Sequence, residues 1–198
     1  MSKFAMGGSA RAALSLAALL AASLLAMPAG AAGPAAVTAT GGTTTLKLRG
    51  TISSLLDVAD VSVKAVAPAT KGSSGLRFPI SGGSIQPTTL RGSVDHLGAL
   101  RFSHGGDSIV MRSLRMKVTV HGASMSASVA GKRITILRLS LAKAIIANPA
   151  ATTVRASNIT ATLSSQGARV VNKEIRTSLF TAGLKIGTVS TRIAVPAR

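Results

Sequence analysis

Cysteine, tryptophan and tyrosine are absent from this sequence, and four phenylalanines are its aromatic residues. The absence of cysteine excludes disulfides, thiol catalysis and cysteine-ligated metals. The scarcity of aromatic rings argues against a protein that reads nucleic acid by stacking on its bases. Any hydrophobic core therefore has to be built mainly from Val, Ile, Leu and Ala.

Acidic residues are also scarce, because five Asp and Glu stand against 23 Lys and Arg, for a formal net charge of +18. So few carboxylates leave little material for the paired acids of a hydrolase. The sequence also lacks a Gly-x-Ser-x-Gly nucleophile motif between a strand and a helix. We therefore expect a non-enzymatic protein with no catalytic residue and no metal site.

Residues 1–31 are typical of a secretory signal. Lys3 and Arg11 carry positive charge, and an uncharged run of mainly Ala, Leu and Ser covers residues 12–27. This run is shorter than the roughly 20 residues of a membrane span, and residues 29–31 form a small-x-small cleavage pattern. We expect cleavage and secretion, with any attachment to the cell envelope being non-covalent. An uncleaved N-terminal anchor is the alternative.

The rest of the chain divides into a leader and one domain. Residues 32–45 are rich in Ala, Gly and Thr and are predicted to be a flexible leader, whereas residues 46–198 alternate between short apolar segments and turn signals. This spacing predicts an all-β fold with one or two short helices, arranged as an antiparallel β-sandwich or a flattened barrel in a single domain.

Local patterns give this prediction its detail. The Gly- and Pro-rich stretch over residues 76–103 predicts three strands. Apolar and basic residues alternate over 114–119, and a change of parity at residues 112–113 predicts a β-bulge there. Two helices are predicted over about residues 53–60 and 164–175, each beginning with a serine cap.

Basic residues are the strongest electrostatic feature of the predicted hairpins. A face of this kind attracts polyanions through release of their counterions. Because aromatic stacking residues are missing, anionic cell-wall polymers or lipid headgroups are better partners than nucleic acid. The alternative is a generally basic, solvated surface without a dedicated partner. The candidate contact residues are Arg112, Arg115, Lys117, Lys132, Arg133 and Arg138.

His96 is the best single candidate for a ligand-binding side chain, because neutral imidazole is a good donor to iron or zinc. It is one of three histidines in the chain. The alternative is a histidine at a strand end whose ring bonds a backbone carbonyl. Asp95 precedes it, but adjacent strand residues point to opposite faces, which argues against a direct acid–base pair.

Several short motifs resemble the central part of the HtaA domain. They are the segments over residues 78–83, 92–94, 96–100 and 126–133, followed by an Ala-containing helix before the last strand. The resemblance covers roughly residues 46–195. It implies a β-rich fold with a few short helices, in a family of secreted or surface-attached proteins of actinobacteria.

The better-known members of that family bind haem and pass it on for iron uptake, so the resemblance also implies haem as a candidate ligand. Those members hold the iron through a tyrosine near the start of the domain, helped by a histidine in the stretch that His96 matches. This chain has no tyrosine, and the corresponding residues 50–61 contain no good ligand for ferric haem.

Two functions follow from these observations. The first is a secreted, non-enzymatic binding module of HtaA type, which holds an apolar or amphipathic small ligand in the cell envelope. The alternative is a cationic structural or adhesive envelope protein that binds anionic wall polymers or lipid headgroups.

Overall fold

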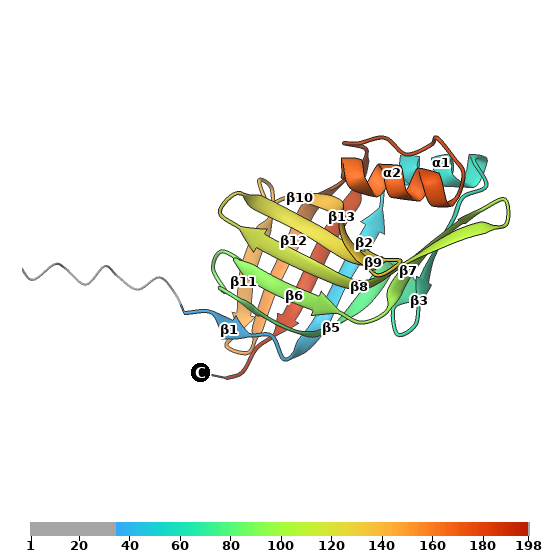
Figure 1. Ribbon diagram of the computed structural model, residues 1–198. Helices are drawn as coiled ribbons and strands as arrows, with labels where there is room; N and C mark the ends of the chain where they lie inside the picture. Colours follow the sequence, from blue (N-terminus) through green and yellow to red (C-terminus); the bar gives the residue numbers. More distant parts are fainter. Residues whose placement is uncertain (1–34, 198) are drawn as a thin grey trace, which may run out of the picture. The chain divides into compact units, whose positions relative to one another are not determined.

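The computed structural model describes residues 35–197, which form antiparallel strands and two short helices (Figure 1). The elements in chain order are β1 (Val37–Thr38), β2 (Gly41–Leu48), α1 (Gly50–Val58), β3 (Ser62–Val66), β4 (Thr70–Gly72), β5 (Gly75–Ile85), β6 (Gly92–His96), β7 (Ala99–His104), β8 (Asp107–Thr119), β9 (Gly122–Val129), β10 (Lys132–Ser140), β11 (Ile145–Ala150), β12 (Thr153–Leu163), α2 (Ser165–Glu174) and β13 (Lys185–Ala194). The predicted all-β class with short helices is confirmed.

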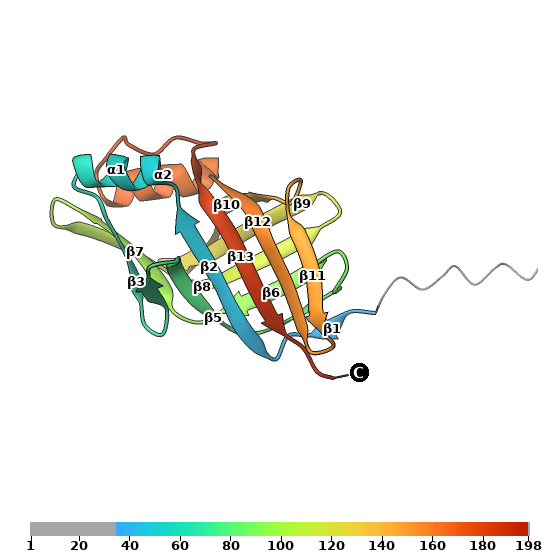
Figure 2. The same cartoon turned by 180° about the vertical axis from the view of Figure 1, so that it is seen from behind.

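Eight strands close into an antiparallel barrel in the order β5–β6–β8–β9–β10–β12–β13–β2 (Figures 1 and 2). The ring closes through β6, which pairs with β5 on one side and with the second half of β8 on the other. Three short strands add further pairings outside this ring: β1 and β4 pair with β5, and β11 pairs with β12. The first half of β8 instead pairs with β7, which pairs with β3. This second arm extends beyond the ring.

The change of partner along β8 occurs at the predicted bulge. Ser113 has a φ of 50°, and the register against β9 shifts between Arg112 and Arg115. An extra residue of this kind bends a strand and increases its twist. β8 can therefore serve both the ring and the β7–β3 arm, and the three strands predicted over residues 76–103 are confirmed as β5, β6 and β7.

Inward-pointing aliphatic side chains fill the barrel. Val94, Met116, Ile159, Val189 and Ile193 are all fully or almost fully buried and come from four different strands. The alternation of buried and exposed residues along these strands is the period-2 pattern of the sequence. The barrel interior is thus a packed core, and space for a ligand has to be sought at its ends.

The structure corrects two boundaries. The predicted flexible leader contains β1 and most of β2, and Thr44 within it is fully buried. The β-branched threonines at positions 43–45 favour a strand, although the Gly content of this stretch resembles a linker. Helix α1 begins at Gly50 after an Arg49 cap, and no serine side chain caps it. By contrast, α2 begins after the predicted cap Ser164.

The predicted signal, residues 1–31, lies outside the described part of the chain. Within residues 35–197, neither helix is long and apolar enough to cross a membrane.

Candidate functional site

His96 lies inside the barrel, and both of its ring nitrogens have partners. Nδ1 is 3.2 Å from the carbonyl oxygen of Leu114, and Nε2 is 2.8 Å from the hydroxyl oxygen of Thr44. A carbonyl only accepts hydrogen bonds, so Nδ1 carries the proton and the Thr44 hydroxyl donates to Nε2. The Thr191 hydroxyl, 2.9 Å from that of Thr44, completes the chain. The four residues connect β8, β6, β2 and β13.

This environment keeps His96 neutral. Burial lowers the pKa of His96 below its ordinary value of 6.5, while the hydrogen bond to Leu114 and the charge of Asp95 act in the opposite direction. The Asp95 side chain itself points outward, as the parity argument predicted, and pairs with Arg115. His96 therefore joins strands within the core, and neither nitrogen is free to bind a ligand.

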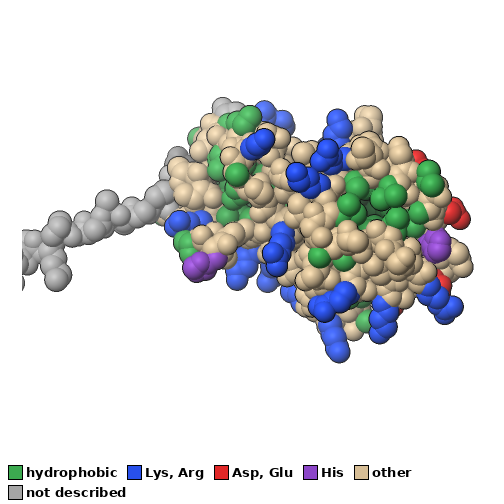
Figure 3. Space-filling view, turned by 90° about the horizontal axis from the view of Figure 1, so that it is seen from above, with side chains coloured by type: hydrophobic (Ala, Val, Ile, Leu, Met, Phe, Trp, Pro, Cys, Tyr) green, Lys and Arg blue, Asp and Glu red, His purple; other side chains and the backbone are tan. Residues whose placement is uncertain are grey.

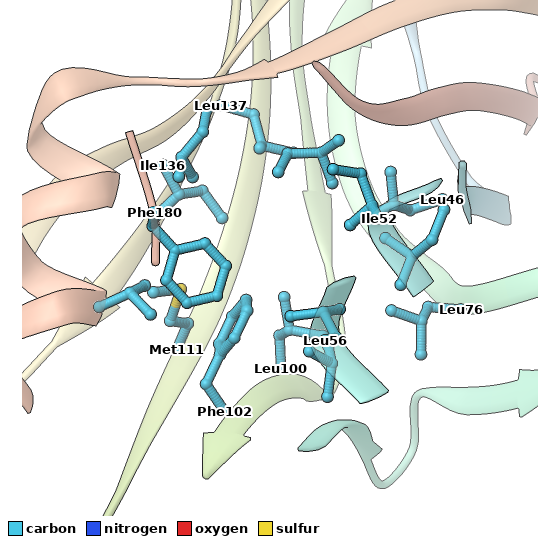
Figure 4. Close-up of a pocket in the computed structure, with 15 residues that line it drawn as sticks. Leu46, Ile52, Leu56, Leu76, Leu100, Phe102, Met111, Ile136, Leu137 and Phe180 are labelled. Atoms are coloured by element: carbon cyan, nitrogen blue, oxygen red, sulfur yellow. The ribbon is translucent and has the colours of Figure 1, made fainter. Parts of the chain in front are cut away.

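An apolar pocket lies at the end of the barrel that carries the helices. It has a volume of about 40 Å³, and all fifteen side chains that line it are apolar (Figure 4). Seen from the helix end, apolar side chains gather around a hollow in the surface (Figure 3). The lining residues come from both helices, the barrel and the β7–β3 arm: Leu46, Leu48, Ile52, Leu56, Val63, Leu76, Leu100, Phe102, Met111, Ile136, Leu137, Leu163, Val171, Phe180 and Ile186.

Helix α2 is fixed tightly against β10 and forms one wall of this pocket. Ser164 accepts a hydrogen bond from the Gly167 backbone N–H at 2.9 Å, which caps the helix, and its own hydroxyl donates to the Thr135 carbonyl of β10. A Cβ at Gly167 would lie 2.6 Å from the Ile136 carbonyl oxygen. Glycine is therefore required for this close approach, which brings Val171 to the pocket.

Asn172, near the end of α2, holds the loop that follows the helix. Its side-chain amide donates to the Phe180 carbonyl at 2.7 Å, and its side-chain carbonyl accepts from the Phe180 N–H at 3.0 Å. The Phe180 ring packs edge-to-face on that of Phe102, with centroids 5.9 Å apart and an interplanar angle of 87°. Two of the few aromatic rings in the chain thus meet at one side of the pocket (Figure 4).

Helix α1 forms the opposite wall and is held more weakly. Its nine residues contribute two buried side chains, Ile52 and Leu56, both of which line the pocket. Leu55 and Val58 are exposed, at 37% and 88% of their full areas, and no side chain caps the first turn. Ile52 and Leu56 are therefore the two side chains that α1 buries against the rest of the domain.

The residues of this pocket do not fit a haem iron. None of its lining side chains carries nitrogen or oxygen, and the single sulfur, in Met111, is a thioether that serves haem proteins as a partner to histidine. His96 is committed to the core, and His104 donates from Nδ1 to the Ile175 carbonyl at 3.2 Å without lining the pocket. Within residues 35–197, no cluster of His, Asp and Glu could hold a metal ion either.

Most of the predicted basic contact residues share one outer face. Lys132 lies at the β9–β10 hairpin, and the other five alternate outward from β8 and β10 on either side of a row of serines from β9. Arg115 is paired with Asp95, which raises the pKa of the guanidinium. The β8–β10 basic face consists of Arg112, Arg115, Lys117, Arg133 and Arg138, with Ser124, Ser126 and Ser128 between them.

Sequence reasoning missed the apolar pocket. Its residues come from ten separate elements and one loop, so no local motif marks it. The available signals were the apolar face of α2 and the two exposed apolar side chains of α1, neither of which distinguishes a pocket wall from ordinary core packing.

No protein-family model matches the sequence, and no curated protein sequence is significantly similar to it. The fold resembles the C-terminal domain of HtaA from Corynebacterium glutamicum, with a TM-score of 0.61 and 16% identity over 81% of this chain and 99% of that domain. The N-terminal domain of the same protein gives a TM-score of 0.60 and 14% identity over 80% and 99% of the two chains.

A domain-swapped dimer of the C-terminal HtaA domain, in which one histidine is replaced by alanine, gives a TM-score of 0.51 and 16% identity over 76% of this chain and 95% of that one. At this level of identity the comparison establishes the fold. The chain therefore has the fold of the HtaA domains, as the motifs in its sequence predicted.

Proposed function

We propose that this protein is a secreted, non-enzymatic module of the cell envelope that holds the apolar part of a small ligand between α1, α2 and the end of the barrel. The observation that supports this function is a surface-opening pocket whose fifteen lining residues are all apolar. Removing hydrocarbon from water is favourable by about 0.8 kcal/mol per CH₂ group. Apolar pockets at the ends of barrels are common sites for such ligands.

The lining restricts the chemistry of the ligand. A polar or charged group placed in the pocket would lose its hydration without gaining a hydrogen bond. The buried part of the ligand is therefore a hydrocarbon segment, such as an acyl or isoprenoid chain, and any polar head remains at the mouth. Because no lining side chain can ligate ferric iron well, haem is a poorer candidate than an iron-free amphipathic molecule.

The size of the pocket requires movement on binding. A volume of about 40 Å³ is far below the several hundred Å³ of typical ligand sites. Helix α1 is the wall that moves most readily, because Ile52 and Leu56 alone are buried from it. An outward displacement of α1 enlarges the pocket while the Ser164 and Asn172 contacts keep α2 in place.

Binding can be followed with a tryptophan, because the chain has no tryptophan or tyrosine of its own. We would replace Leu56 by Trp in the pocket wall and titrate the purified protein with cis-parinaric acid, a fatty acid that accepts energy from indole. The matched control is Val120→Trp, at a residue that is 65% exposed and does not line the pocket. We expect saturable quenching in the Leu56→Trp protein and weaker quenching in the control, whose indole lies outside the pocket and transfers energy over a longer distance.

The wild-type protein provides an independent measurement, because emission from the bound polyene rises when it leaves water. A Val63→Asp substitution, which places a charge on the half-buried part of the lining, should weaken that signal at least tenfold. Equal quenching of both tryptophans, or no rise in emission with the wild-type protein, would contradict the proposal.

Export forms part of the same proposal and has its own test. If residues 1–31 are a cleaved signal, expression in a secreting actinobacterial host should yield extracellular protein that begins at residue 32. Terminal sequencing by mass spectrometry decides this. Intracellular accumulation of the full chain would refute export without affecting ligand binding.

A further inference from the structure

Three arginines line an open groove on the outer surface of the barrel. The groove has a volume of about 600 Å³ and crosses β5, β2, β13, β12 and β11. Arg77 comes from β5, Arg192 from β13 and Arg155 from β12, and all three are exposed. None of them forms an ion pair with any residue in the described range 35–197. This arginine groove is separate from the β8–β10 basic face.

The register of the sheet places two of these cations together. Arg155 and Arg192 are direct cross-strand partners, so their Cβ atoms lie about 5 Å apart on the same face. Like charges in that position destabilise a sheet unless an anion lies between them. Lys64 and Arg101 form a second cation pair, on β3 and β7, and neither residue lines the arginine groove.

Hydroxyl side chains supply most of the remaining lining of the groove, which also includes Ile145, Ala147 and Ala156. Thr45 is the cross-strand partner of Arg77 and of Ser190, and Thr43 is the partner of Arg192. Guanidinium groups bind phosphate oxygens with two parallel hydrogen bonds, and neighbouring hydroxyls donate to the oxygens that remain. From strand and residue spacings, Arg77 is roughly 12 Å from the Arg155–Arg192 pair. The groove can therefore contact two phosphate groups along one chain.

We infer that the arginine groove binds a phosphodiester polymer without nucleobases, such as a polyol-phosphate wall polymer. Three observations favour this partner: the unpaired arginines, the hydroxyl groups beside them, and the large excess of basic over acidic residues, which draws polyanions to the protein. A single-stranded nucleic acid would need aromatic platforms, and the groove lining contains none. A bilayer presents a flat surface, whereas these cations line a hollow.

The test measures binding of the purified protein to poly(glycerol phosphate) by isothermal titration calorimetry at low and moderate salt. The groove variant is Arg155→Gln/Arg192→Gln, and the matched control is Lys64→Gln/Arg101→Gln, which loses the same two charges from the other cation pair. We expect at least tenfold weaker binding for the groove variant, together with a shallower dependence on salt. The control should change affinity less than threefold.

Several outcomes would overturn the inference. Equal losses of affinity in the two variants would mean that polymer binding depends only on the net charge of the protein. A loss confined to Lys117→Gln/Arg138→Gln places the site on the β8–β10 basic face. Tighter groove-dependent binding of oligo(dT), or binding of anionic vesicles without binding of the polymer, assigns another partner class. The groove variant and its matched control each remove repulsion between exposed side chains, so their thermal midpoints should not fall. Binding of cis-parinaric acid should be unchanged in both of these proteins.

Discussion

The hydrogen-bond chain through His96 makes the stability of the barrel depend on pH in a defined direction. Burial lowers the pKa of His96 in the folded protein, whereas the unfolded chain keeps a value near 6.5. As the pH falls below about 6.5, His96 becomes protonated in the unfolded state but stays neutral in the folded state. The free energy of unfolding therefore decreases on acidification, and this contribution is fully present only above that pH.

The size of the effect follows from linkage. The free energy of unfolding changes by at most about 1.4 kcal/mol per pH unit while His96 is protonated in the unfolded state and neutral in the folded state. Between pH 8 and pH 5.5, His96 alone should therefore remove up to about 1.4 kcal/mol of stability. The loss levels off once the pH falls below the pKa of His96 in the folded state.

The assay is urea unfolding followed by far-ultraviolet circular dichroism, because the chain has no tryptophan to report by fluorescence. Measurements at half-unit steps of pH, on the wild type and on His96→Leu, isolate this residue from the other titrating groups. The wild-type curve should fall more steeply than the variant curve below pH 6.5. Parallel curves, or a wild type that gains stability on acidification, would refute the assignment of a buried neutral imidazole.

Substitutions of the two threonines in this hydrogen-bond network test the network a second time. Thr44→Val removes the donor to His96 and the acceptor for Thr191, which leaves two buried polar groups without a partner, at about 1–3 kcal/mol each. Thr191→Val removes one donor at the end of the hydrogen-bond network and should cost about 1 kcal/mol of stability. The order of the two losses follows from the position of Thr44 between two partners, and a larger loss for Thr191→Val would contradict this hydrogen-bond chain.

Three further predictions concern the pocket walls. Asn172→Ala should cost about 1–3 kcal/mol in urea unfolding and weaken cis-parinaric acid binding, because both backbone groups of Phe180 lose their partner. Gly167→Ala should cost about 1–3 kcal/mol, because its Cβ meets the backbone of β10, whereas Gly50→Ala, with open space around it, should be neutral or stabilising. Haemin titration should give the same Soret spectrum with the wild type and with His96→Ala, because neither imidazole nitrogen of His96 is free to bind iron.

Local patterns in the sequence predicted several of the individual elements. Alternation along residues 114–119 predicted the inward and outward faces of β8, and the parity change at Ser113 marked the bulge at which that strand changes partner. Ser164 identified the start of α2 because an N-cap is a local contact. Closure of the ring was left open between a sandwich and a barrel, because it depends on β6 pairing with strands on both sides.

The candidate sites could not be predicted in the same way. Phe102 and Phe180 are far apart in sequence and meet because Asn172 fixes the second ring. His96 carries the residue type of a ligand, but its role is decided by Thr44, which lies in a segment that its composition marked as a leader. Side-chain chemistry is local information, whereas burial and partners arise from long-range pairing.

The polar chain in the core and the arginine groove on the surface depend on the same strand register. On β2, Thr44 points into the barrel and Thr43 points out, and on β13 the same holds for Thr191 and Arg192. A slip of one residue between strands would exchange the two faces. The Thr44–Thr191 hydrogen bond is satisfied in one register, and that register also places Thr43 opposite Arg192. In a chain without disulfides, buried polar pairing is thus one means by which the barrel keeps its outer cations in position.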